Sequence, residues 1–271
     1  MYKNLYKKYR YSLILLRELV ITEFKLRYQG SVLGYLWSLL RPLFLFVILY
    51  FVFVYFLRIG SDVPHWPVAM LLGIVLWNFF SEVTNNGVSS IVSRGDVIRK
   101  INFPKYVIVL AGSMSALINL GINLVVVGIF LFLNGVELHW TSLLAIPYIL
   151  ELFVFALGLS FLLSALFVKL RDVNYIWEII MQGLFYASAV IYPIAMVLER
   201  SSVLGQALLI NPIAQSIQDV RHHLVSEVNP TLYTLSDNIW ITLIPIVIVV
   251  ATFLAGAWYF KLKSPSFAEN V

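Results

Sequence analysis

Long apolar segments separated by short polar and basic loops dominate the hydrophobic pattern of this chain. A helix needs about 20 largely apolar residues to cross the roughly 30 Å hydrocarbon core of a membrane. Six segments meet that requirement: Leu36–Leu57, Val68–Ser89, Val107–Asn134, Leu143–Phe167, Ile176–Val197 and Trp240–Phe260. We expect each to be helical, because a lipid-exposed backbone must satisfy its own hydrogen bonds. The pattern therefore predicts an all-α integral membrane protein with six transmembrane helices.

Two further segments differ from this pattern. Residues 1–34 carry apolar side chains at helical spacing among many basic ones, which is typical of an amphipathic helix at the membrane interface. Residues 198–238 contain the apolar run 203–210, which is too short to cross a membrane, followed by Asn211-Pro212. We expect an external re-entrant hairpin there, between spans five and six, with Pro193 ending the fifth span.

Composition supports the membrane assignment: 61% of the 271 residues are hydrophobic and 12% are charged, whereas soluble domains have about a quarter charged residues. Fifteen of the lysines and arginines fall on one side of the predicted topology and three on the other. The positive-inside rule then makes both termini cytoplasmic. The basic residues on the cytoplasmic side account for the net charge of +5, so that charge does not indicate nucleic acid as a partner. We expect one transmembrane domain over 1–271, with a bundle at 35–261 and a cytoplasmic tail at 262–271.

The loop after the second span combines basic and apolar residues. A solvated loop has no need of an apolar stripe, whereas a short helix that docks into a groove on a partner uses one as anchors. A loop folded against its own lipid headgroups is the alternative. The candidate docking residues are Arg94, Asp96, Val97, Ile98, Arg99, Lys100, Ile101 and Phe103.

Three basic residues lie where the N-terminal segment enters the membrane: Lys25, Arg27 and Arg41. The N-terminal helix is either a passive anchor or a gate that meets an anionic lipid headgroup. Arg41 can extend to the interface or bind a phosphate.

The first span is rich in aromatic residues. Four share one helical face: Trp37, Phe44, Phe51 and Tyr55. Periodicity favours lipid contact or helix packing for them, and a surface on which sugar rings stack is the alternative.

The acids Glu82, Glu151 and Glu178 fall within or near predicted spans, where hydrogen bonding between helices is the favoured role and a proton relay the alternative. The chain has no cysteine, no G-x-x-x-x-G-K-[ST] loop and no H-E-x-x-H helix. We therefore expect no catalytic residues, no bound metal and no ATP site in this chain. If transport is ATP-driven, ATP is hydrolysed by another polypeptide.

Several short motifs occur in order along the chain and resemble those of the type-2 ATP-binding-cassette (ABC) permeases that export bacterial polysaccharides. They are Arg17–Leu19, Glu23–Tyr28, Gly30–Trp37, Arg41–Leu43, Ile101–Lys105, Leu170–Val173 and Asn211–Ala214. Each motif is weak alone, but together with six spans they are specific. Arg41 departs from the family, which often has an uncharged polar residue before the proline.

The resemblance implies a permease homodimer in the bacterial inner membrane with two copies of a cytoplasmic ATPase, which would bind ATP and Mg²⁺. The substrate would be O-antigen, capsule or teichoic acid carried on polyprenyl diphosphate. Residues 1–34 would form the gate, 94–105 the coupling helix and 198–238 the external closure, and the aromatic face would line the sugar path. An ion-coupled secondary transporter and a membrane enzyme acting on lipid-linked sugars are the alternatives.

Overall fold

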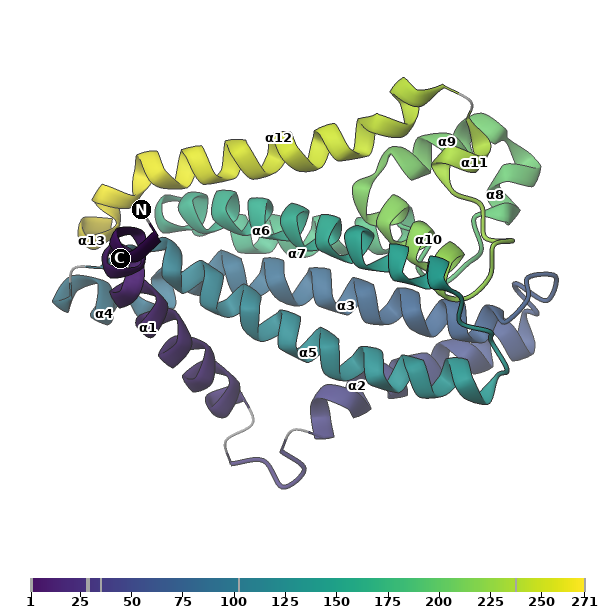
Figure 1. Ribbon diagram of the computed structural model, residues 1–271, viewed down its shortest axis with the longest axis horizontal. Coiled ribbons are helices and arrows are strands. Elements are labelled where there is room, and N and C mark those ends of the chain that lie inside the picture. The colour runs from purple at the N-terminus through teal and green to yellow at the C-terminus, as the bar shows by residue number, and fades with distance from the viewer. Residues whose placement is uncertain (1, 28–29, 35, 102, 237, 271) are drawn as a thin grey trace.

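A computed structural model describes residues 2–27, 30–34, 36–101, 103–236 and 238–270. The described chain forms helices joined by loops, without a strand (Figure 1). The longer helices are α1 (Tyr2–Arg27), α2 (Leu36–Leu49), α3 (Trp66–Ser90), α5 (Tyr106–Leu133), α6 (Ala145–Lys169), α7 (Val173–Ala187) and α12 (Ile239–Lys263). The shorter ones are η1 (Tyr50–Phe56), η2 (Val92–Arg94), α4 (Gly95–Lys100), η3 (Trp140–Leu144), α8 (Ala195–Arg200), α9 (Ser202–Ile210), α10 (Pro212–Leu224), α11 (Leu232–Leu235), η4 (Ser264–Ser266) and α13 (Phe267–Asn270).

Five helical segments of the described chain are long and apolar enough to cross a membrane. They are Leu36–Phe56, Trp66–Ser90, Tyr106–Leu133, Trp140–Lys169 and Ile239–Asn270. Each overlaps one of the six predicted spans, so the prediction of an all-helical chain with several apolar helices of membrane-spanning length is confirmed for the described residues, whereas the count of six spans stays a prediction.

The segment predicted as the fifth span has a different structure. Its helix, α7, has 15 residues and is therefore about 22 Å long, which is shorter than the hydrocarbon core. The chain leaves the helix at Ser188, and Ala189 adopts a left-handed conformation with φ of 48°. The helix thus ends before Pro193, which we had expected to end it, and that proline instead precedes α8.

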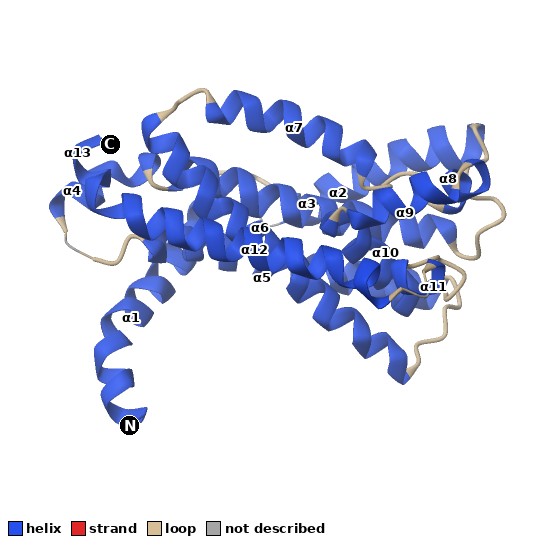
Figure 2. Ribbon diagram, turned by 90° about the horizontal axis from the view of Figure 1, so that it is seen from above, coloured by secondary structure: helices blue, strands red, loops and turns tan. Residues whose placement is uncertain are grey.

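The two ends of the bundle carry different structures. Both chain termini lie at the same end as α4 and α13, whereas α8, α9, α10 and α11 gather at the opposite end (Figures 1 and 2). This arrangement agrees with the prediction that the termini and the loop after the second span share one side.

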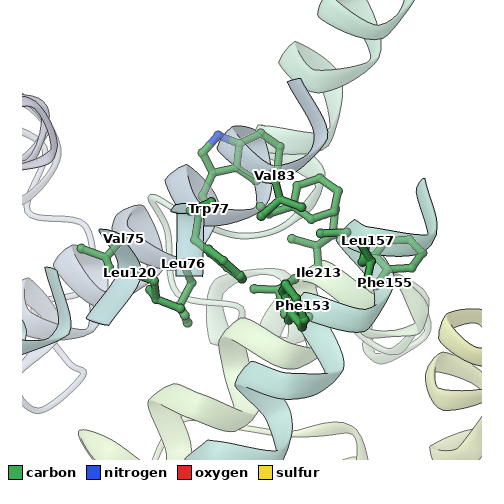
Figure 3. Packing of buried hydrophobic residues seen from close by; sticks show 14 of the residues in the cluster. Val75, Leu76, Trp77, Val83, Leu120, Phe153, Phe155, Leu157 and Ile213 are labelled. Carbon is green, nitrogen blue, oxygen red and sulfur yellow. The ribbon is translucent and has the colours of Figure 1, made fainter. Parts of the chain in front are cut away.

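The core is built around α3, which packs against α5 and α6. Figure 3 shows Trp77 of α3 in the same cluster as Phe153 of α6 and Ile213 of α10. Helices α6 and α12 approach closely at two glycines: a Cβ atom on Gly158 would lie 2.6 Å from the Cα of Phe253, and one on Gly256 would overlap the Gly158 carbonyl. Small residues of this kind let membrane helices pack backbone to backbone.

Helix α10 is one of the four short helices that gather at the end opposite the termini, and it packs against α6 and α3. Asn211 caps its first turn by accepting a hydrogen bond from the Ile213 amide at 3.1 Å, and Pro212 is its first residue. This helix lies within residues 198–238, where we predict a re-entrant hairpin, and a re-entrant path through a membrane stays a prediction.

The side chain of Arg221 fastens α10 to its neighbours. It is fully buried and donates hydrogen bonds to the carbonyls of Ala69 (2.8 Å), Ala189 (2.8 Å) and Val190 (2.6 Å). Burial lowers the pKa of Arg221 to about 9, which leaves the guanidinium protonated at neutral pH. These bonds hold the turn after α7 in place.

Candidate functional site

A polar cavity of about 470 Å³ lies between α2, α3 and α5. Its lining includes a carboxylate, a guanidinium, an indole and five asparagine side chains. These residues are Glu82, Arg41, Trp37, Asn78, Asn85, Asn86, Asn119 and Asn123. Polar side chains in a membrane-spanning bundle are costly unless they face protein or water, so they commonly mark a substrate path.

Helical spacing explains why these polar residues meet. Asn78, Glu82 and Asn85 follow one another at steps of four and three along α3, and therefore share one face. Asn119 and Asn123 are separated by one turn of α5. The two faces are joined by a hydrogen bond in which Asn119 Nδ2 donates to Glu82 Oε2 at 2.7 Å.

Arg41 and Trp37 of α2 line the cavity. They lie one helical turn apart, and both are exposed while lining the cavity. Arg41 forms no ion pair with another described residue. The cavity thus combines a cation, a carboxylate hydrogen-bonded to Asn119, neutral amides that donate and accept hydrogen bonds, and an aromatic ring. A guanidinium can donate charge-assisted hydrogen bonds to a phosphate, and amides can donate to and accept from sugar hydroxyls.

The two other predicted headgroup residues lie on α1. Lys25 is exposed, and Arg27 ends the helix with its side chain outside the described residues. The chain then turns through Gly30 and Gly34, whose φ angles of 80° and 49° suit glycine, before α2 begins. The N-terminal helix therefore ends at Arg27, earlier than the predicted segment 1–34, and is separate from the first span.

The predicted aromatic face is exposed along its length. Trp37, Phe44, Phe51 and Tyr55 are all exposed, and the rings of Phe51 and Tyr55 are in edge-to-face contact with centroids 6.0 Å apart. Residues 50–56 form a π-helix, whose wider turns change the spacing that an α-helical projection assumes. The face remains available to lipid, to a second copy of the chain or to substrate.

The predicted docking loop divides into a buried and an exposed part. Ile98 and Phe103 are 5% and 6% exposed and pack into the core, so their side chains hold the segment against the bundle. The exposed part consists of Asp96, Val97, Arg99, Lys100 and Ile101. Asp96 accepts a hydrogen bond from Arg99 Nη2 at 3.0 Å.

Arg94 connects this loop to the N-terminal helix. Its Nη2 atom donates to Glu23 Oε1 of α1 at 2.6 Å, and each side chain is 21% exposed. Charge-assisted hydrogen bonds of this length are strong, especially when partly desolvated. The pair therefore joins the predicted gate helix to the predicted docking loop.

The intramembrane acids form hydrogen bonds, as predicted, but not all of them between helices. Glu82 bonds to α5 in the polar cavity, and Glu151 of α6 accepts from Gln215 of α10 at 3.5 Å. Glu178 is exposed and accepts from Asn174 of its own helix at 3.1 Å.

The histidines are grouped, although the sequence distributes them over several loops. All four, His65, His139, His222 and His223, line one cavity of about 560 Å³. Among the described residues, no three His, Asp or Glu side chains are arranged to share a metal ion.

Comparison with known proteins identifies relatives of this chain. The family model described as "ABC-2 type transporter" matches residues 14–224. Two curated relatives from Klebsiella pneumoniae, each called O-antigen export system permease protein RfbA, are 29% identical over 215 residues, which cover 78% of this chain and 81% of each relative. A protein of the same name from Myxococcus xanthus is 30% identical over 199 residues, covering 73% of this chain and 75% of that relative.

Proposed function

Because the chain belongs to the ABC-2 type transporter family, we propose that it is the membrane permease of an ATP-driven exporter of cell-surface polysaccharide. O-antigen is the first candidate substrate, because the curated relatives are named as O-antigen export permeases. Capsule and teichoic acid, which the sequence motifs also allow, are the alternatives. A secondary transporter or a membrane enzyme does not account for the family match.

The polar cavity between α2, α3 and α5 carries this proposal. A polyprenyl diphosphate-linked glycan has an anionic diphosphate beside neutral, hydroxyl-rich sugars. Arg41 supplies a cation for the phosphate, and the facing amides of α3 and α5 supply hydrogen-bond donors and acceptors for hydroxyls. Trp37 offers a ring on which a sugar can stack. Lys25 and Arg27 would attract the headgroup at the membrane interface before it reaches the cavity.

Movement of the ATPase subunit would be transmitted to the permease through the exposed part of the docking loop. A separate ATPase subunit would contact Asp96, Val97, Arg99, Lys100 and Ile101, and its closure on ATP would displace α4. Because Arg94 directly precedes α4 and bonds to Glu23, the same displacement would move α1. Two permeases and two ATPases would form the complex, with the exposed aromatic face of α2 and η1 covered by the second permease or lining the sugar path.

Complementation tests this function. The chain is produced together with its ATPase in a strain that lacks an O-antigen permease, and surface O-antigen is measured on intact cells. We expect export to return with the unaltered chain, and to fall at least tenfold with Arg41→Ala or Asn119→Leu. Arg58→Ala, which removes an exposed arginine outside the cavity, is the matched control. Equal export by Arg41→Ala, Asn119→Leu and the control would exclude the cavity as the substrate site.

A further inference from the structure

A second cavity, of about 430 Å³, lies where the start of α5 meets α6 and the end of α12. We call it the lysine groove. Aromatic side chains form much of its lining: the rings of Phe161 and Phe260 are in contact with centroids 5.2 Å apart, and Phe103 is 6% exposed beside them. Its volume falls within the range of about 300–1,000 Å³ that is usual for small-ligand sites.

Two lysines line this groove without an acid to balance them. Lys105 directly precedes α5, and Lys261 lies in the last turn of α12. Lys105 is partly exposed and Lys261 is exposed, and neither forms an ion pair within the described residues. No aspartate or glutamate of the described chain lines the groove. The groove therefore presents two positive charges beside an aromatic surface.

Both lysines lie at the level where membrane-spanning helices end. Helices α5 and α12 each belong to a segment that is long and apolar enough to cross a membrane. The start of α5 and the end of α12 lie at the end of the bundle that carries α4, α13 and the chain termini (Figure 1). Basic residues at such helix ends meet the lipid headgroups, and basic pockets between spanning helices bind anionic ones.

The surface beside the groove is suited to acyl chains. Leu254, Trp258 and Leu262 follow one another at steps of four along α12 and are 61%, 67% and 56% exposed. Lys261 is three residues from Trp258, so it lies next to this apolar stripe on the helix. A ligand that combines an anionic headgroup with an acyl chain thus matches both the charge and the apolar surface.

The groove lacks the groups that the polar cavity offers to a glycan. No asparagine, glutamine or arginine side chain of the described chain lines it. One of its two hydroxyls, that of Ser264, donates to the carbonyl of Lys261 at 3.1 Å. A phospholipid of the bilayer therefore fits the groove better than a lipid-linked glycan does.

We propose that Lys105 and Lys261 bind the phosphate of an anionic phospholipid, with part of an acyl chain lying against the aromatic lining of the groove. Charge complementarity and the neighbouring apolar stripe identify this occupant. The lipid would link the segment that follows the docking loop to the end of α12. The inference does not depend on which substrate the protein transports.

Lipid titration of the purified permease tests the proposal. The full chain in detergent is stripped of lipid and titrated with phosphatidylglycerol or with phosphatidylcholine of the same acyl chains, and bound lipids are counted by native mass spectrometry. We expect saturable binding of phosphatidylglycerol that is at least tenfold tighter than that of phosphatidylcholine. Lys105→Gln and Lys261→Gln should each weaken it at least threefold. Lys263→Gln, which removes an exposed lysine of the same helix outside the groove, is the matched control and should bind normally.

Four results would overturn the proposal. Equal affinity for the two lipids, or an equal loss in all three variants, would show only general attraction to charge. Competition by glycerol 3-phosphate at the same concentration would show a phosphate site that needs no acyl chain. Tighter binding of polyprenyl phosphate than of phosphatidylglycerol would assign the groove to the transported lipid. Normal phosphatidylglycerol binding by Lys105→Gln/Lys261→Gln, with loss of ATPase binding, would assign the lysines to that protein.

Discussion

The ion pair between Glu23 of α1 and Arg94 before α4 is predicted to transmit ATPase movement to the gate helix. Arg94→Glu or Glu23→Arg places like charges together and breaks the 2.6 Å hydrogen bond. The double variant Glu23→Arg/Arg94→Glu restores opposite charges with their positions exchanged. A direct role therefore predicts that both single variants are impaired and that the double variant recovers.

The expected magnitude follows from the geometry of the pair. A hydrogen bond to a charged group contributes about 1.5–3 kcal/mol, and a fully exposed ion pair about 0.2–1 kcal/mol. Both side chains are 21% exposed, so we expect an intermediate coupling energy of about 1–2 kcal/mol. That energy corresponds to a change of about 5- to 30-fold in the coupled equilibrium.

The assay measures surface polysaccharide on cells together with the ATPase activity of the purified permease–ATPase complex. Each single variant should reduce export about 5- to 30-fold while remaining in the membrane at a normal amount. The double variant should recover most of that loss. Glu269→Arg, a charge reversal at an exposed site of α13, is the control and should export normally. If the double variant instead reduces export by the product of the two single-variant factors, the two residues act independently, and a direct link between Glu23 and Arg94 is refuted.

Three further variants test the rest of the account. Arg99→Glu/Lys100→Glu should abolish stimulation of the ATPase by the permease while leaving the permease in the membrane, and normal stimulation would exclude α4 as the docking site. Gly158→Ala should destabilise the bundle by about 1–3 kcal/mol through overpacking, seen as a lower thermal midpoint in detergent, whereas Gly183→Ala, with open space around it, should leave the midpoint unchanged. Arg221→Met should lower the midpoint, because it leaves the buried carbonyls of Ala69, Ala189 and Val190 without their donor, each at a cost of about 1–3 kcal/mol; a midpoint within a degree of the unaltered chain would contradict the role assigned to these hydrogen bonds.

Most of the fold could be predicted from the sequence, because an apolar run of about 20 residues predicts a membrane-spanning helix without information from the rest of the chain. The second predicted span, Val68–Ser89, corresponds to α3 at Trp66–Ser90. The fifth span was predicted too long, because Ile176–Val197 is largely apolar, and the turn at Ala189 and Val190 has its carbonyls bound by Arg221, which is distant in sequence. No local pattern reports such a contact.

The candidate site could be predicted only in part. Arg41 and Trp37 were identified by charge and ring type, and both line the polar cavity. The asparagines were missed, although Asn119 and Asn123 are spaced one turn apart within an apolar run and could have been detected by that spacing. The Glu23–Arg94 pair and the gathering of the four histidines depend on how distant loops are placed, which one sequence does not specify.

Reconstituted transport tests the central claim most directly. The permease and its ATPase subunit are placed in vesicles that contain polyprenyl diphosphate-linked O-antigen, and the polymer that becomes inaccessible to an added glycosidase is measured. Protection that requires ATP, the ATPase subunit and an intact Arg41 is the predicted result. Protection driven by a proton gradient without the ATPase subunit, or ATP-driven protection unaffected by Arg41→Ala and Asn119→Leu, would contradict the account.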